Sequence, residues 1–441
     1  MRFLERRFQL AAHGTNVRTE ALAGLTTFLT MAYIIFVQPA VLSACGMDVG
    51  AVLTATCLST ALATTLMALF ANYPIAVAPA MGHNFFFAYS VVLGMKVPWR
   101  VALGAVAVAG IIFIITAGIG LRERLITAIP DSLKHAIAAG IGLLIAMIGL
   151  QWAGLIVASP GTLVALGDLH SRPVVVAVAS LALTSILMAR RVPGAFLWGI
   201  LASTAIGVPL GIIGYEGIAS RPPSLAPTFL QLDVVGAFAP GMAAVIFVFF
   251  FLALFDSVGT LVAVGSQAGF MRRGTLPRAR GALLADAVGT VAGAALGTST
   301  VTAYIESGAG VAAGGRTGLT SLVTAALFLL SLFAYPLVRT IGGGYLVDQR
   351  TLYPAIAAPL ILVGTMMIGG LREVTWEDPT EAIPAFLTAI VMPLAVSITE
   401  GVAFGVVAHV VLKGAAGRPR EVDPMMLVFA LLFVARYLFL R

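Results

Sequence analysis

Cysteine and charge are both scarce in this sequence. Cys45 and Cys57 are the only cysteines among 441 residues, and the five histidines lack the spacing of metal ligands. No disulfide framework, metal site or cofactor is therefore expected. Charged residues make up 10% of the chain and hydrophobic residues 60%, whereas about a quarter of a soluble domain is charged. This composition excludes a soluble fold and predicts an all-α polytopic membrane protein.

Apolar runs mark the membrane crossings. A crossing helix needs about 20 apolar residues, and fourteen runs meet or approach that length. They lie at residues 21–43, 51–70, 73–95, 101–121, 133–153, 173–190, 194–214, 238–264, 281–297, 298–315, 318–338, 354–371, 382–396 and 399–414. A further apolar stretch at 425–440 is interrupted by Arg436, so we expect an amphipathic interfacial helix within a cytoplasmic segment 416–441.

The distribution of lysine and arginine predicts the orientation of the chain. With residues 1–20 placed in the cytoplasm, twenty of the 26 basic residues fall on the inner side of the membrane and six on the outer side. Cytoplasmic loops carry this bias. We therefore expect a protein of the bacterial inner membrane, surrounded by lipid, with both termini in the cytoplasm. The formal charge of +7 then reflects orientation, and no nucleic-acid partner is expected.

A proline-rich segment divides the chain into two halves. Residues 221–227 contain three prolines and leave seven predicted spans on either side. The halves are residues 21–220 and 238–415, joined by a periplasmic linker at 221–237. Related halves with an odd number of spans insert with opposite orientations, and transporters built from such inverted repeats bind substrate near the midplane of the membrane. The sequence thus predicts a 7+7 inverted repeat.

The third span of each half interrupts its apolar pattern. Pro74 and Pro79 forbid a continuous helix through 73–80, and a half-helix is expected at 81–93. In the second half, alternating Thr, Val and Tyr at 297–306 favour a strand, and the small residues after Glu306 favour a half-helix. Opposite insertion would bring two half-helix N-termini, with free N–H groups, together in mid-membrane. The alternative is two kinked helices without a ligand.

Two carboxylates at membrane depth favour a binding site over that alternative. Glu306 lies at the second break, and Asp256 interrupts a very apolar span. No lysine or arginine lies at comparable depth, so a proton is the expected partner of both acids. Thr260 shares the helix face of Asp256, and we expect Tyr304 and Asn84 to line the same cavity. For each acid, a hydrogen bond that caps or bridges helices is the alternative.

Other polar and aromatic residues give weaker signals. Asp286 lies near Arg278 and Arg280, which favours an interfacial ion pair or helix cap over contact with a ligand. His83 either faces the cavity or satisfies a neighbouring group. One ring of the run 85–87, with Phe85 as the candidate, is expected to stack on a flat ligand, whereas the other two favour a lipid or core face.

Four motifs carry a resemblance to a known family. They are FLTMAY at 28–33, ANYPIA at 71–76, LFDSVGT at 254–260 and GTSTVTAYIES at 297–307. With them the sequence resembles the AzgA-like permeases for adenine, guanine and hypoxanthine, within the nucleobase transporter superfamily. The resemblance implies a core domain of spans 1–4 and 8–11, a gate domain of spans 5–7 and 12–14, and a homodimer. It assigns base binding to Asp256 with Thr260, and adds Glu306, Tyr304 and Asn84.

These observations together predict a secondary transporter and not an enzyme. We expect a proton-coupled symporter that imports purine bases by an elevator movement of its core domain, with Glu306 and Asp256 as the coupling acids. One alternative is an anion transporter of the same architecture, such as a sulfate or bicarbonate carrier, which would favour a basic residue at the cavity. An intramembrane enzyme would need an aspartate-rich metal site or an activated nucleophile. A channel is the third alternative.

Overall fold

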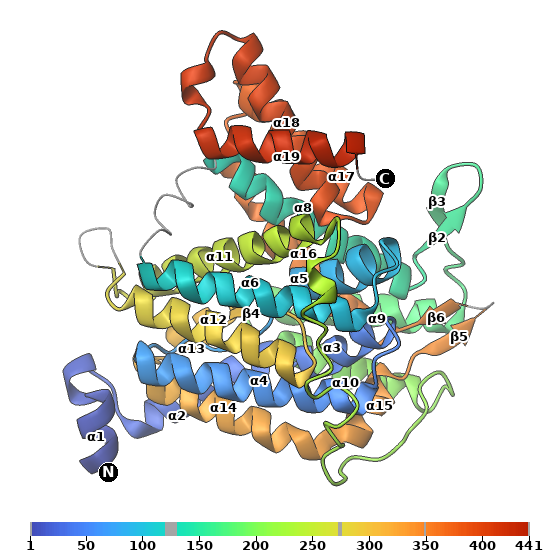
Figure 1. Ribbon diagram of the computed structural model, residues 1–441. Helices are drawn as coiled ribbons and strands as arrows, with labels where there is room; N and C mark the ends of the chain where they lie inside the picture. Colours follow the sequence, from blue (N-terminus) through green and yellow to red (C-terminus); the bar gives the residue numbers. More distant parts are fainter. Residues whose placement is uncertain (1, 120–129, 272–275, 348–349, 440–441) are drawn as a thin grey trace.

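The structure is a computed structural model that describes residues 2–119, 130–271, 276–347 and 350–439, and these residues form a helical bundle (Figure 1). Nine helices in the described ranges are long and apolar enough to cross a membrane, as a polytopic protein requires. Five residues of the orientation count lie outside the described residues: Arg122, Arg124, Arg272, Arg273 and Arg441.

The helices pack into two groups, which we name the core group and the gate group. The core group contains α2 (Val17–Met31), α3 (Ile34–Ser43), α4 (Val49–Phe70), α6 (Trp99–Ile119), α11 (Met242–Gln267), α12 (Ala279–Leu296), α14 (Gly318–Leu330) and α15 (Tyr335–Gly342). The gate group contains α8 (Asp131–Trp152), α9 (Arg172–Ala189), α10 (Ala195–Gly207), α16 (Ala357–Met367), α17 (Pro379–Ala395) and α18 (Ile398–Ala415). In Figure 1, α4, α6, α12 and α14 run side by side, and α17 and α18 stand at the top with α8.

Two crossings in the core group are broken. The first consists of strand β1 (Val77–Pro79), helix α5 (Met81–Phe85) and a π-helix, η2 (Phe86–Gly94). The second consists of strand β4 (Val301–Ala303) and helix α13 (Ser307–Ala312), which is shorter than the small-residue run suggested. The strands stand in the two segments for which extended chain was expected. The first span also breaks, between α2 and α3, at Ala32 and Tyr33.

The two strands pair with each other in the centre of the bundle. β1 and β4 are antiparallel, with Ala78 opposite Thr302. The surrounding hydrogen bonds are two-fold symmetric, because Ala80 N–H donates to the Thr300 carbonyl at 3.0 Å and Tyr304 N–H donates to the Ala76 carbonyl at 2.9 Å. Backbone groups that would lack partners inside a membrane are thereby satisfied across the two halves.

A threonine from a neighbouring helix holds each strand. The Thr64 hydroxyl of α4 donates to the Val77 carbonyl at 3.0 Å and accepts from the Val77 N–H at 2.9 Å. The Thr290 hydroxyl of α12 makes the same two bonds with Val301, at 2.8 Å and 3.3 Å. The same pair of threonine hydrogen bonds thus occurs in each half, which supports an internal two-fold relation between the halves.

The remaining elements lie at the periphery. They are α1 (Arg2–Phe8), the hairpins β2–β3 (Ile156–Ser159, Leu163–Leu166) and β5–β6 (Tyr345–Val347, Arg350–Leu352), the 3₁₀ helices η1 (Ala11–His13), η3 (Gly236–Phe238), η4 (Ser331–Ala334), η5 (Ile368–Glu373) and η6 (Pro419–Glu421), and helix α19 (Pro424–Phe439). The segment between the halves contacts the ends of two core helices, since Asp233 N–H donates to the Arg100 carbonyl and Leu230 N–H to the Ala295 carbonyl.

The C-terminal helix α19 contacts two other helices. It packs against α18, and the ring centroids of Phe429 and Phe247 of α11 are 4.3 Å apart. Arg436 donates to Glu400 in the first turn of α18 at 2.8 Å, whereas Lys413 lies near the other end of that helix. An 18-residue helix is about 27 Å long, so Arg436 and Lys413 do not share one level. α19 therefore turns back along α18, and the cytoplasmic assignment of both basic residues stays a prediction.

Candidate functional site

The candidate site lies where the two broken crossings meet in the core group. Ala76 N–H donates to the Ser307 hydroxyl at 3.0 Å, so the start of α13 lies beside β1. The side-chain hydroxyl of Ser299 donates to the Asn84 amide oxygen, which ties the start of β4 to α5. The site therefore combines residues from both halves of the sequence.

The two half-helix N-termini offer different numbers of free N–H groups. In α13 the amides of Ser307, Gly308 and Ala309 already donate to local carbonyls at 2.9–3.1 Å. The expectation of free amides at α13 is therefore wrong, because a tight turn after β4 uses them. Across the described residues, the amides at 81–83 in the first turn of α5 have no hydrogen-bond acceptor. These donors suit a ligand with acceptor atoms.

Both predicted acids lie at this junction and remain half-buried. Thr302 of β4 donates to the Asp256 carboxylate of α11 at 2.7 Å. Tyr33 donates to the Glu306 carboxylate at 2.7 Å. Asp256 is close enough to act electrostatically on Glu306 and on Tyr304. Among the described residues, no salt bridge includes Asp256 or Glu306.

Tyr304 and Asn84 lie at the same junction. The Tyr304 hydroxyl donates to the Pro79 carbonyl at the end of β1, and the side chain is buried. Asn84 is fully buried, and its side-chain amide nitrogen has no hydrogen-bond partner in the described ranges. A buried amide donor without an acceptor is costly unless a ligand or water satisfies it. Asn84 is thus a candidate donor to a ligand.

Three other candidates, Thr260, His83 and Phe85, make no hydrogen bond to the acids in the described part of the chain. Thr260 is buried one turn beyond Asp256, and no hydrogen bond in the described structure joins it to the other site residues. The His83 ring is buried, and its Nε2 atom has no hydrogen-bond partner among the described residues. Phe85 stacks on Tyr89, with ring centroids 5.8 Å apart.

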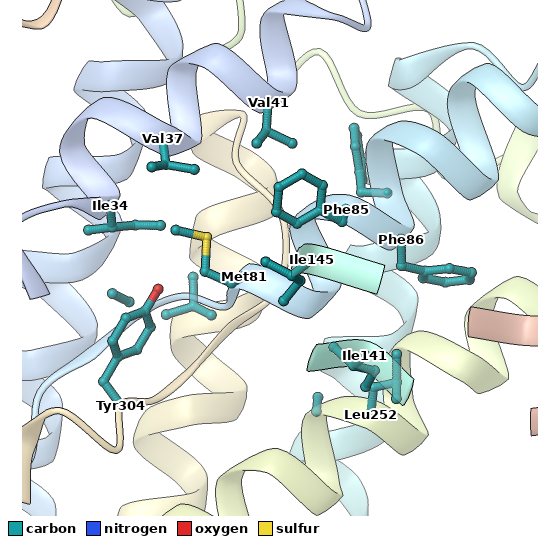
Figure 2. Packing of buried hydrophobic residues seen from close by; sticks show 14 of the residues in the cluster. Ile34, Val37, Val41, Met81, Phe85, Phe86, Ile141, Ile145, Leu252 and Tyr304 are labelled. Carbon is teal, nitrogen blue, oxygen red and sulfur yellow. The ribbon is translucent and has the colours of Figure 1, made fainter. Parts of the chain in front are cut away.

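The surroundings of Phe85 are those of a packed interior. The ring is completely buried, and Figure 2 shows it close to Val41 and Ile145, on the far side of Met81 from Tyr304. The structure does not bring Phe85 to the acids, because α5 directs this ring toward α8 in the gate group.

Asp286 corrects an expectation. Instead of pairing with Arg278 or Arg280, this residue of α12 is completely buried and accepts from the Ala303 N–H of β4 at 3.2 Å. One of its carboxylate oxygens has no partner among the described residues. The partner of Asp286 is β4, a strand that follows α12 in the sequence. The nearness of Asp286 to two arginines along the chain could not indicate this contact.

Sequence reasoning missed three groups that complete the site: Tyr33, Ser299 and Thr302. Each lies within a motif that carried the family resemblance. A tyrosine or hydroxyl residue inside an apolar motif was the available signal. It did not indicate which carboxylate or amide each hydroxyl contacts.

Comparisons with known proteins identify the family. A sequence model of the Permease family (Xan_ur_permease) matches residues 18–404. The chain belongs to this family. Adenine permease AdeP of Escherichia coli (strain K12) is 45% identical over 99% of this chain and 96% of its own length. Guanine/hypoxanthine permease PbuG of Bacillus subtilis (strain 168) is 44% identical over 98% of this chain and 99% of its own length.

The Permease family assignment confirms the resemblance to AzgA-like permeases, and with the apolar helices it makes the chain an integral membrane protein. A solved structure agrees on the fold. The transmembrane domain of a cyanobacterium bicarbonate transporter, BicA, superposes with a TM-score of 0.64 over 88% of this chain and 97% of that chain, at 19% identity. At that identity, the likeness concerns the fold alone.

Proposed function

We propose that this permease is a proton-coupled symporter that imports purine nucleobases. The proposal depends above all on the pair Asp256 and Glu306, two half-buried carboxylates with no basic partner in the described part of the protein. An acid at membrane depth without a cation is stable when it is protonated or bound to a ligand. Relatives named for adenine and for guanine/hypoxanthine support purines as the substrate class.

The groups at the junction complement a purine. Ring N–H and exocyclic amino groups of the base would donate to Asp256 or Glu306, and ring nitrogens or a carbonyl would accept from Asn84 and from the first amides of α5. Tyr304 and Thr260 would complete the binding residues. Phe85 packs its ring against Trp152 of α8, so in this proposal it would hold α5 in place instead of stacking on the base.

The proton would couple binding to movement. Protonation of Glu306 or Asp256 removes a buried negative charge, which lowers the cost of moving the site past the apolar gate group. The core group would then carry the base across the membrane in an elevator movement against a gate group held in a homodimer. In this proposal the chain has fourteen crossings and cytoplasmic termini.

Uptake of labelled purines tests the proposal. Cells that lack their own purine permeases, and that express this chain, should accumulate adenine, guanine or hypoxanthine, and a proton uncoupler should abolish the accumulation. Competition by unlabelled bases would rank the purines. Accumulation of labelled bicarbonate or sulfate instead of purines would favour the anion-transporter alternative.

A variant tests the coupling role. Glu306→Gln keeps the size of the side chain and removes its titration, so we expect accumulation to fall at least tenfold. Glu216→Gln is the matched control, because Glu216 pairs with Arg339 away from the site at 2.8 Å. Full accumulation by Glu306→Gln would contradict the coupling role.

A further inference from the structure

Tyr33 connects the candidate coupling acid to the gate group. It lies at the break between α2 and α3, is 1% exposed, and donates its hydroxyl to Glu306 at 2.7 Å. Its ring meets Phe196 of α10 edge-on, with centroids 5.2 Å apart and planes at 69°. One side chain therefore contacts both the carboxylate and a gate helix.

Helix α2 lies close to the start of α10. Gly194, the residue before α10, has a positive φ of 72°, and a β-carbon there would lie 3.0 Å from Leu29 of α2. The backbone of α10 thus approaches the end of α2 just before the break. Tyr33 therefore lies at the surface where the core and gate groups meet.

The strength of the Tyr33 hydrogen bond depends on the charge of Glu306. A hydroxyl bound to an ionised carboxylate makes a charge-assisted bond, which is roughly twice as strong as a neutral one. The titratable groups that face Glu306 are Tyr33 from the α2–α3 break, Asp256 from α11 and Tyr304 from the end of β4. Of these, Tyr33 is the one that donates a side-chain hydrogen bond to it.

We propose that Tyr33 is a positioning residue that transmits the protonation state of Glu306 to α10. While Glu306 is ionised, Tyr33 is held against Phe196, and the core group stays docked on the gate group. When Glu306 takes up a proton, the bond weakens and the aromatic contact is released. The inference rests on the proposed role of Glu306 as the coupling acid.

The first test measures protonation without transport. Infrared difference spectra of the purified protein are recorded over a pH series. The carboxyl band that disappears in Glu306→Gln is the band of Glu306. Tyr33→Phe removes a donor to the ionised form, so the midpoint of this band should move to higher pH by about one unit, equivalent to tenfold in proton affinity. Tyr73→Phe is the matched control, because the buried Tyr73 hydroxyl has no partner in the described ranges. An unchanged midpoint in Tyr33→Phe overturns the inference, whatever the substrate proves to be.

The second test measures transmission to α10. Phe196→Leu keeps the Tyr33–Glu306 bond and removes the ring contact, so the infrared midpoint should stay in place while the maximal uptake rate changes at least threefold with little change in KM. Tyr33→Phe should shift the pH profile of uptake in the same direction as the infrared midpoint. An unchanged maximal rate in Phe196→Leu would contradict transmission, whereas absent purine uptake by the unaltered chain would contradict the proposed function alone.

Discussion

Three carboxylates in the core group show how hydrogen bonding separates a structural acid from a candidate binding acid. Glu20 is completely buried and accepts from the amides of Arg316, Thr317 and Thr320 and from the Thr320 hydroxyl, at 2.6–3.3 Å. Its capacity of about four bonds is filled, and it caps the start of α14. Asp256 and Glu306 each accept one side-chain hydrogen bond. Their carboxylate oxygens can therefore accept further hydrogen bonds from a ligand.

Glu20 should therefore matter for stability and not for the chemistry of transport. Glu20→Gln replaces one acceptor oxygen by a donor that would face backbone N–H groups, so we expect a loss of about 1–3 kcal/mol. Thermal unfolding in detergent would measure it as a lower Tm. Exposed Glu377→Gln is the control, with no expected change. A normal Tm in Glu20→Gln would show that the cap contributes little.

At the scale of elements, the paired strands β1 and β4 depend on two threonines in neighbouring helices. Thr64 and Thr290 each satisfy both backbone groups of one valine in their strand. Because the strands pair with each other, loosening one strand also loosens its partner. The two helices thus act on a single structural unit.

Valine substitutions at the two threonines test this unit. Thr64→Val and Thr290→Val keep the shape of the side chain but remove two hydrogen bonds, so each should cost about 1–3 kcal/mol. The double variant should cost less than the sum of the two, because contacts within one unit are not additive. Thermal unfolding of the four proteins in this cycle provides the measurement. Strict additivity would argue against a shared unit, and Thr26→Val, which removes a bond within one helix, is the control.

At the scale of the whole molecule, an ion-pair cluster ties the C-terminal segment to the start of α17. Arg418 contacts Asp378 and Glu421 at 2.6 Å, and the buried Lys413 contacts Glu381 and Glu421 at 2.8 Å. Hydrogen bonds from Arg418, followed by those from Thr380, lower the pKa of Asp378. Hydrogen bonds from Arg418, followed by those from Lys413, lower the pKa of Glu421.

These lowered pKa values fix the sign of a pH effect. A carboxyl group whose pKa is lower in the folded protein stabilises it above the unfolded pKa, about 4, and this contribution is lost as the pH falls through the folded value. Arg418→Gln should therefore lower the Tm at pH 7, and the difference from the unaltered protein should shrink as the pH falls below about 4. Melting curves across this range test the effect, and a pH-independent difference would contradict it.

Much of the architecture could be predicted from the sequence because membrane spans have a strong apolar signal. The two breaks were predictable as well, since Pro74 and Pro79 exclude a helix and the threonines before Glu306 favour extended chain. Asp256 and Glu306 stood out because charge is rare at that depth.

Contacts between distant segments could not be predicted in the same way. Asp286 lies close to two arginines along the chain, but in the fold its carboxylate accepts a hydrogen bond from the Ala303 N–H of β4. The break at Tyr33 has no proline or glycine to mark it, and Phe85 gave no sign of which neighbour its ring would meet. Apolar periodicity reports depth and burial, whereas these features depend on which helices become neighbours.

The pairing of β1 with β4 also has a consequence for biosynthesis. The backbone of β1 enters the membrane early in translation, yet the strand that satisfies it is made only after half of the chain has followed. Until then the insertion machinery or water has to shelter its polar groups. The newly made first half is thus incomplete inside the lipid bilayer, and truncated chains that end before β4 should be prime substrates for membrane proteases.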